Sequence, residues 1–168
     1  MIFITSKNTK RLTYKEKRKI LILKNEFWKK GIKSQENWFK KNIKHSDIHN
    51  LLFNNNNLIG YTCLRYRTFK IRKKFLKYFY FDTLIVSKKS RNKNFGSLLT
   101  SFDNKIIETK KKPSFLVCDK KRVRFYKKNN WITLKRNNFE VMDENYGSKI
   151  GMIYNFTPKN KLYFWVKK

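Results

Sequence analysis

The sequence predicts a single α/β domain that combines an antiparallel hairpin with a strand–loop–helix unit. Apolar residues 48–53 and 58–69 flank four consecutive asparagines, which is the pattern of a β-hairpin. Residues 77–87 have the aromatic and β-branched composition of a central strand. Residues 95–106 then place apolar side chains at helical spacing. Because strand and helix patterns alternate after the hairpin, we expect an α/β mixture with a mostly antiparallel start and one strand–loop–helix unit in the middle.

Two helices are predicted before the hairpin. Residues 13–30 carry apolar side chains at helical spacing, and Gly31 is expected to cap this helix at its C-terminus. Residues 34–43 form a short second helix with Ser34 as the expected N-cap.

The helix that starts at Phe95 is expected to end in the run ETKKK before Pro113, where lysines face the negative end of the helix dipole. Residues 114–118 predict a short buried strand. Asp119 is positioned to cap a helix over residues 120–129. Residues 131–142 and 150–156 predict two further strands.

Composition limits the number of domains and the kinds of partner. A chain of 168 residues, 40% hydrophobic, is long enough for one core, so we expect one domain over residues 1–168. The formal net charge of +31 attracts polyanions such as nucleic acids, anionic membrane surfaces and phosphorylated ligands. The same abundance of Lys, Asn, Ile, Phe and Tyr is also what AT-rich coding produces, and both explanations stay open.

The two cysteines predict neither a disulfide nor a metal site. Cys63 and Cys118 lie in apolar runs without a CxxC spacing or a histidine cluster, so we expect buried thiols in a reducing compartment and no bound metal. No segment approaches the length of a membrane span, and the start MIFITSKNTK lacks the order of a signal peptide. We therefore expect a cytoplasmic protein, and its oligomeric state, monomer or dimer, stays open.

The segment VSKKSRNKNFGSLL, residues 86–99, resembles the acetyl-CoA signature of the GNAT superfamily of N-acetyltransferases. That signature reads R/Q-x-x-G-x-G/A; Arg91 and Gly96 match its outer positions, and Asn94 replaces the first glycine. Asn is the non-glycine residue that best tolerates left-handed φ, so the replacement is compatible with a phosphate-binding turn. A solvated basic turn is the alternative interpretation of this segment alone.

A second segment resembles the same family about thirty residues later. CDKKRVRFYKKNNW, residues 118–131, matches the pattern N-x-x-A-x-x-F-Y-x-x-x-G-F at Phe125 and Tyr126, with Asp119 at the Asn position and Asn130-Trp131 in place of Gly-Phe. The resemblance covers residues 59–141. The helices in residues 13–43 then correspond to the region that shapes the acceptor site in this superfamily.

The resemblance implies a GNAT fold: a twisted mixed sheet of six to seven strands, mostly antiparallel with a central parallel pair, flanked by about four helices. It also implies acetyl-CoA as co-substrate, with no metal. The residues expected to bind it are the strand residues Leu84, Ile85 and Val86, the loop residues Arg91, Asn92, Lys93, Asn94, Phe95, Gly96 and Ser97, and Asp119. The N-terminal amides and dipole of the helix after the loop would favour a pyrophosphate.

Tyr126 is the candidate general acid that returns a proton to the departing thiolate, because its unperturbed pKa of about 10 keeps it protonated at neutral pH. A core aromatic is the alternative role. Asp82 is the candidate base: alternation places it on the strand face of Leu84 and Val86. A paired structural carboxylate, with water carrying the proton, is the alternative for Asp82.

Asp47 and His49 are candidate acceptor-binding residues, since they follow the two predicted helices and a neutral histidine accepts a proton near pH 7. Their alternative is an Asp that caps its own turn beside a surface His. Together these residues predict an N-acetyltransferase that moves an acetyl group to a primary amine of a small molecule, an amino sugar or a protein, by direct attack in a ternary complex. The alternatives are a basic nucleic-acid-binding module and a pseudoenzyme that only binds the cofactor.

Overall fold

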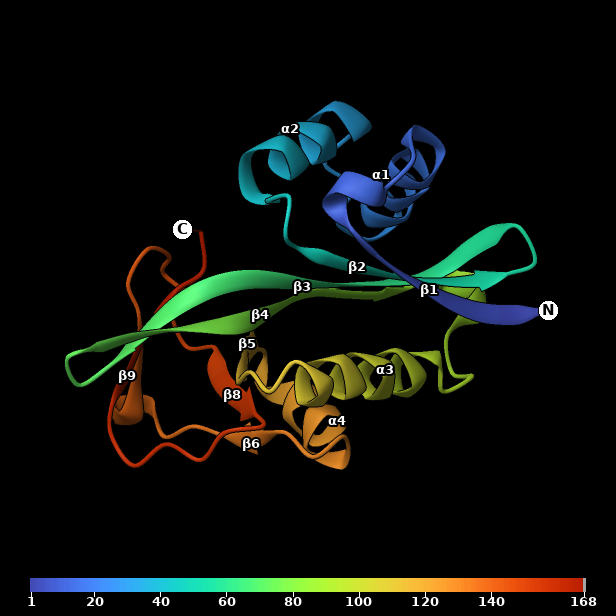
Figure 1. The fold of residues 1–168 in the computed structure, drawn as a ribbon. Coiled ribbons are helices and arrows are strands. Elements are labelled where there is room, and N and C mark those ends of the chain that lie inside the picture. The colour runs from blue at the N-terminus through green and yellow to red at the C-terminus, as the bar shows by residue number, and fades with distance from the viewer. Residues whose placement is uncertain (168) are drawn as a thin grey trace. The chain divides into compact units, whose positions relative to one another are not determined.

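The computed structural model of the protein describes residues 1–167, which contain four α-helices and a nine-stranded sheet (Figure 1). The strands are β1 (Ile2–Asn8), β2 (Ile48–Asn54), β3 (Asn57–Ile71), β4 (Lys74–Val86), β5 (Ser114–Cys118), β6 (Ile132–Thr133), β7 (Phe139–Val141), β8 (Ile150–Tyr154) and β9 (Leu162–Trp165). The helices are α1 (Tyr14–Trp28), α2 (Ile32–Asn42), α3 (Phe95–Thr109) and α4 (Val123–Lys128). No helix among the described residues is both long enough and apolar enough to cross a bilayer.

The chain divides into two compact units. The first unit comprises Met1–Leu64 and Asp82–Asp103, and the second comprises Arg65–Phe81 and Asn104–Lys168. Strands β3 and β4 and helix α3 contribute residues to both units.

The first unit is a sheet portion with helices on both faces. Its strands follow the order β1-β2-β3-β4, with antiparallel pairing of β1 with β2 and of β2 with β3. Helices α1 and α2 lie on one face and the start of α3 on the other (Figure 1). Ile20 of α1 packs with Leu51 and Ile85, while Leu99 of α3 packs with Leu52. A sheet enclosed in this way can hold polar groups away from water.

The second unit holds the parallel strand pair and an aromatic core. Strand β4 pairs in parallel with β5 at Phe79–Ser114 and Tyr80–Phe115, and β5 pairs antiparallel with β8. Strand β6 pairs with β8, β9 with β3, and β7 with β9. The rings of Phe115 and Phe164 stack with centroids 3.9 Å apart at the centre of this core.

The predicted hairpin, the four helices and the parallel pair within a mixed sheet are confirmed. The predicted strand number of six to seven is wrong, because β1 and β9 carry no clear alternation and were not expected. Residues 131–142 do not form one strand: β6 and β7 are separated by a 3-10 turn at Arg136–Asn138.

Two helix caps also differ from the prediction. Helix α1 ends at Lys29, which adopts the left-handed conformation with φ 47, and Gly31 instead precedes α2 with φ 83. Helix α2 therefore begins two residues before Ser34, which lies inside its first turn. A glycine at Gly31 serves the sharp reversal between the two helices, since positive φ costs glycine little.

Candidate functional site

The loop between β4 and α3 turns through two left-handed asparagines. Asn92 and Asn94 have φ 61 and φ 57, so both occupy the conformation that the first glycine of the resembled signature would supply. Helix α3 then starts at Phe95, and the Leu98 amide donates a hydrogen bond to the Asn94 carbonyl at 3.0 Å. The earlier amides of an α-helix have no intrahelical acceptor, so they are available to an anion.

The same loop contacts α1 and carries several cations. Arg91 Nε donates to the carbonyl of Val86 at 3.2 Å, and its guanidinium lies 5.6 Å from the Phe27 ring centroid. The amide of Lys88 donates to Glu26 Oε1 at 2.9 Å. These contacts hold the β4 side of an exposed basic loop that leads to the N-terminus of α3, where a phosphate would find charge and amides together.

The last residues of β4 lead into this loop. Leu84 and Val86 pack with Leu99 on the α3 face, whereas Ile85 belongs to the core beneath α1. In the parallel pairing of β4 with β5, the paired residues of β4 are Phe79 and Tyr80, so Leu84, Ile85 and Val86 lie beyond this pairing. Backbone N–H and C=O groups of these three residues that point toward the β5 edge can therefore bond a ligand in place of a neighbouring strand.

Strand β4 also contains a backbone outlier at Thr83, whose φ is 59. For a β-branched residue this conformation is unfavourable by about 1–3 kcal/mol, and such strain is concentrated at binding and catalytic sites. The outlier interrupts the strict alternation of side chains that a regular strand would show.

Asp82 consequently lies on the other face of the sheet from the one predicted. Asp82 and Thr83 line a pocket of about 270 Å³ together with residues of α1, α2 and the turn between them, whereas Leu84 and Val86 face α3. The prediction that alternation places Asp82 beside Leu84 and Val86 is wrong, because the left-handed Thr83 shifts the side-chain direction by one position. The carboxylate therefore faces the two N-terminal helices.

The pocket walls are two indoles and a buried lysine. Lys24 is 3% exposed, with its Nζ 3.4 Å from the ring centroid of Trp38 and 5.5 Å from that of Trp28. Gln35 is also buried and lines the same pocket. The pocket thus offers a carboxylate, an amide and apolar ring faces to a small ligand.

His49 and Asp47, the candidate acceptor-binding residues, lie in the interior of the first unit. Both are 0% exposed. His49 Nδ1 is hydrogen-bonded to the hydroxyl of Tyr61 at 2.7 Å, and Nε2 to Thr9 Oγ1 at 2.8 Å. Because Thr9 Oγ1 donates its proton to the Lys44 carbonyl, Nε2 is the donor to Thr9, and Nδ1 accepts from Tyr61.

Burial lowers the pKa of His49 to about 4, so the ring is neutral at pH 7. Burial also raises the pKa of the Tyr61 hydroxyl above its usual value. Asp47 accepts a hydrogen bond from the amide of Lys44 at 2.8 Å, which closes its own turn. These hydrogen bonds of His49, Tyr61 and Asp47 connect the end of β1, strand β2 and the turn before β2.

The second unit contains the candidate acid Tyr126. The Tyr126 ring is 7% exposed and lies edge-on to Phe81 and Trp131, each with centroids 6.0 Å away. Trp131 Nε1 donates to Asn104 Oδ1 at 3.1 Å, and Asn130 before it is left-handed with φ 65. Asn130 therefore takes the conformation of the family glycine, as Asn94 does in the first unit.

Asp119 precedes a short 3-10 turn, Lys120–Arg122, and not α4 itself. Its side chain makes no capping hydrogen bond, although its carbonyl accepts from the Arg122 amide at 2.9 Å. The expected capping role is therefore wrong. Cys118 next to it is a buried free thiol, and burial raises its pKa to about 11.

Comparison with known proteins gives matches to structures but not to sequences. No protein-family model and no curated protein sequence matches the chain. Escherichia coli ElaA is 22% identical, with 91% of this chain and 99% of that chain covered and a TM-score of 0.64. A GNAT-family acetyltransferase from Staphylococcus aureus Mu50 is 20% identical, with 91% and 98% covered and a TM-score of 0.58.

The PaiA N-acetyltransferase of Thermoplasma acidophilum, solved in complex with coenzyme A, is 17% identical, with 92% of this chain and 99% of that chain covered and a TM-score of 0.57. The protein has the GNAT fold. In this GNAT fold the segment 86–99 comprises the end of β4, the loop and the start of α3, and the segment 118–131 runs from the end of β5 through α4. Both segments therefore lie where the resemblance requires a strand-to-helix connection.

Several residues of this pocket were not predicted from the sequence. Lys24, Trp28, Gln35 and Trp38 line the pocket with Asp82, but on their helices they look like ordinary amphipathic positions. The available signal was the presence of two tryptophans ten residues apart in a chain with four.

Proposed function

We propose that this GNAT-fold protein is an acetyl-CoA-dependent N-acetyltransferase acting on a primary amine. The observation that carries the proposal is the turn at Asn92–Asn94, which brings a basic loop onto the N-terminus of α3 directly after β4. Acetyl-CoA supplies the activated thioester carbonyl when it is bound. The acceptor, whether a small amine, an amino sugar or a protein, would bind in the pocket around Asp82.

The residues at the loop fit a pyrophosphate without a metal. Arg91, Lys93 and the first amides of α3 supply charge and hydrogen-bond donors, and Gly96 leaves the second helical position without a side chain. The backbone of residues 84–86 would bond the amide groups of the pantetheine arm. The exposed Asp119 carboxylate has no comparable support, and its role in cofactor binding stays a prediction.

The chemistry requires a neutral amine in front of the thioester carbonyl. In this proposal Asp82 attracts the acceptor ammonium group into the pocket and accepts its proton, directly or through water. The Trp38 ring already holds the Lys24 ammonium group, so the Trp28 ring is the face that would stabilise a cationic acceptor before it loses that proton. A main-chain N–H near Leu84 would then stabilise the developing oxyanion.

The proton for the departing thiolate is assigned to Tyr126. Replacing it with Phe removes only the hydroxyl, and the ring can keep its contacts with Phe81 and Trp131. We expect Tyr126→Phe to lower turnover while the affinity for acetyl-CoA stays within about twofold. Equal turnover of variant and wild type would leave Tyr126 as a core aromatic.

Calorimetric titration with acetyl-CoA tests the cofactor site first, with nucleic-acid-free protein in 0.1 M and 0.5 M salt. We expect saturable one-to-one binding in both buffers and at least a tenfold weaker affinity for Gly96→Asp, because its carboxylate would repel the phosphates. Ser148→Asp adds the same charge on an exposed loop and is expected to bind like wild type. Binding that disappears in 0.5 M salt, or equal losses in both variants, would contradict a shaped site.

Release of free thiol from acetyl-CoA then tests catalysis, with small amines, amino sugars and a lysine peptide as acceptors. Turnover with one class would identify the acceptor. Intact acetyl-CoA binding without turnover on any of the three classes would favour a pseudoenzyme that binds the cofactor only.

A further inference from the structure

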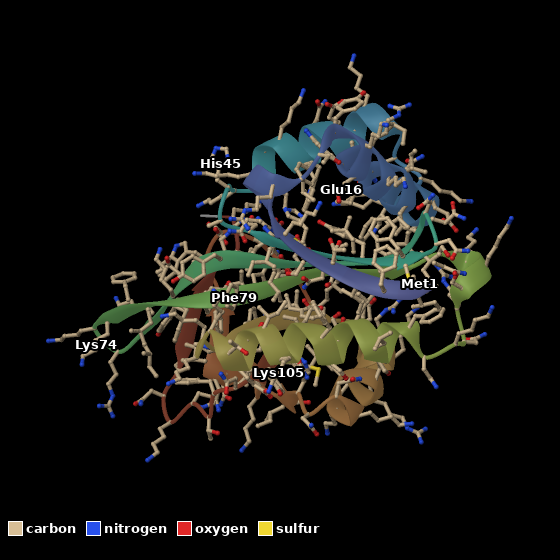
Figure 2. The ribbon with its side chains drawn as sticks, turned by 45° about the vertical axis from the view of Figure 1, so that its right-hand side comes forward. Met1, Glu16, His45, Lys74, Phe79 and Lys105 are labelled. Carbon is tan, nitrogen blue, oxygen red and sulfur yellow. The ribbon has the colours of Figure 1, made fainter. Side chains whose placement is uncertain are left out.

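The β3–β4 hairpin of the second unit carries many cations and exposed rings. Residues 65–81 contain seven Lys or Arg and no Asp or Glu. At the tip, Phe75 is 62% exposed and Leu76 42% exposed. Figure 2 shows Lys74 at this tip, with side chains that point away from the ribbon. Adjacent exposed apolar residues that form a patch, unlike single ones, mark a binding surface.

The pairing of β3 with β9 separates two faces. Phe69 pairs with Phe164 and Ile71 with Leu162, and these residues belong to or pack against the aromatic core. Lys70 pairs with Tyr163 and Thr68 with Trp165 on the alternate positions, which are only partly buried. One face is therefore core, and the other presents rings beside a cation.

A groove runs over this second face, and we call its lining the hairpin surface: Lys70, Arg72, Phe75, Lys161, Tyr163 and Trp165, together with Met142 and Asn160. No carboxylate lines the groove among the described residues. Glu140 lies nearby, with Oε2 3.1 Å from Lys161 Nζ, and Asn160 accepts from Arg72 Nε at 3.2 Å. The groove is thus cationic even after these contacts are counted.

Rings and cations lie within stacking reach of one another in the groove. The Phe75 and Trp165 centroids are 5.7 Å apart, with the rings tilted by 45°. Lys70 Nζ lies 5.6 Å from the Phe75 centroid, and Lys161 Nζ lies 5.2 Å from that of Tyr163. A planar ligand stacked on one of these rings would have a cation next to it.

We propose that the hairpin surface binds single-stranded nucleic acid. Bases stack on exposed rings without sequence preference, and neighbouring Lys and Arg neutralise the phosphates. A groove lined by rings and cations, with no carboxylate among its described lining residues, offers both interactions at once. An acidic peptide would use the cations but leave the three rings without partners, so the nucleic acid fits more of the surface.

This binding does not depend on the proposed acetyl transfer. The hairpin surface belongs to the second unit, whereas the loop at the N-terminus of α3 belongs to the first. The two proposals can therefore fail separately, and acetyl-CoA affinity measured on the same variants distinguishes them.

Fluorescence anisotropy with a labelled 12-nucleotide oligothymidylate tests the proposal, using nucleic-acid-free full-length protein over a range of NaCl concentrations. We expect Phe75→Ala to weaken binding by about fivefold to 150-fold, the effect of losing one stacked base. Tyr14→Ala is the matched control, because Tyr14 is 76% exposed and lies in the first unit. This control is expected to bind like wild type.

The charge contribution is measured with the double variant Lys70→Gln, Arg72→Gln, which removes two cations of the hairpin surface. We expect the slope of log affinity against log salt to fall by about 1.4, which corresponds to two lost phosphate contacts on a single strand. Lys15→Gln, Lys41→Gln makes the same charge change in the first unit and is expected to change the slope less. Unchanged melting temperatures would show that all variants fold.

Wild-type affinity of both Phe75→Ala and Tyr14→Ala would overturn the proposal, since binding would then depend on charge and not on the Phe75 ring. Vesicles containing phosphatidylserine give the other decisive result. If Phe75→Ala weakens vesicle binding but leaves oligonucleotide binding unchanged, the hairpin surface is a membrane contact and the proposal is wrong.

Discussion

Asp103 gives a quantitative test of the first unit, because its carboxyl group lies in the core between α3 and the sheet. It is 0% exposed and accepts a hydrogen bond from Asn50 Nδ2 at 2.5 Å. Burial raises its pKa from 3.8 to about 7, although side-chain hydrogen bonds from Thr62 and Asn50 act in the opposite direction. The folded protein therefore disfavours the ionised form.

The raised pKa makes folding stability depend on pH. The contribution of protonated Asp103 to the free energy of unfolding is fully present below pH 3.8, the pKa in the unfolded chain, and is lost as the pH rises through about 7. Each unit of pKa difference corresponds to about 1.4 kcal/mol, so roughly 3 kcal/mol should be lost between pH 5 and pH 8. Asp103→Asn keeps an oxygen for Asn50 but cannot ionise, and it should not lose this stability.

Urea unfolding followed by tryptophan fluorescence at pH 5, 6, 7 and 8 measures the effect. His49 contributes the opposite dependence, because its lowered pKa removes stability as the pH falls from 6.5 toward about 4. That contribution is common to both proteins and cancels in the difference between them. We expect the unfolding free energy of Asp103→Asn to rise by about 3 kcal/mol relative to that of the wild type between pH 5 and pH 8.

Glu36→Gln is the control for the charge change, since Glu36 lies on α2 with a partly exposed side chain that pairs with Lys40. Its unfolding free energy is expected to follow the wild-type profile within about 0.5 kcal/mol. Parallel profiles for wild type and Asp103→Asn would refute the reasoning, because Asp103 would then ionise equally well in the folded and unfolded chains.

Two further predictions concern the pocket and the aromatic core. Asp82→Asn is expected to lower the rate of acetyl transfer about 10²-fold to 10⁴-fold with unchanged acetyl-CoA affinity, and an unchanged rate would assign the proton to water. Gly151→Ala is expected to lower the free energy of unfolding in urea by about 1–3 kcal/mol, because the added Cβ would lie 2.6 Å from the Phe139 ring in the core. Gly60→Ala should cost less, since the nearest atom is the flexible end of Leu99 at 2.8 Å; a larger loss at Gly60 would contradict this packing argument.

The fold was largely predictable because its strongest patterns are local. Apolar residues at helical spacing predicted α3, and two apolar runs around four asparagines predicted the hairpin of β2 and β3. Strand β1 could not be predicted in the same way, because its burial does not alternate cleanly and it forms by pairing with β2, some forty residues later. Pairing partners at that distance leave no periodic signal in the edge strand itself.

The left-handed loop was predictable from residue chemistry, and the buried histidine was not. Asn94 and Asn130 were expected to replace glycines, and both adopt positive φ. His49 looked like a pH-active ligand because nothing in its sequence neighbourhood shows that Tyr61 and Thr9 fill both ring nitrogens. Those partners come from β3 and from the residue after β1, and only the folded sheet brings them together.

The error at Asp82 has a local cause that connects fold and site. A regular strand would direct Asp82 toward α3, where Leu84 and Val86 pack, and the sequence contains no glycine to warn of an irregularity. The positive φ at Thr83 directs it instead toward Lys24 and the indoles. Thr is a poor residue for this conformation, so the surrounding contacts must stabilise a backbone that its own propensity opposes. A strand that merely filled the sheet would have no need of this strain. The interruption therefore agrees with the role that we propose for Asp82, because rules of local consistency are expected to fail at functional positions.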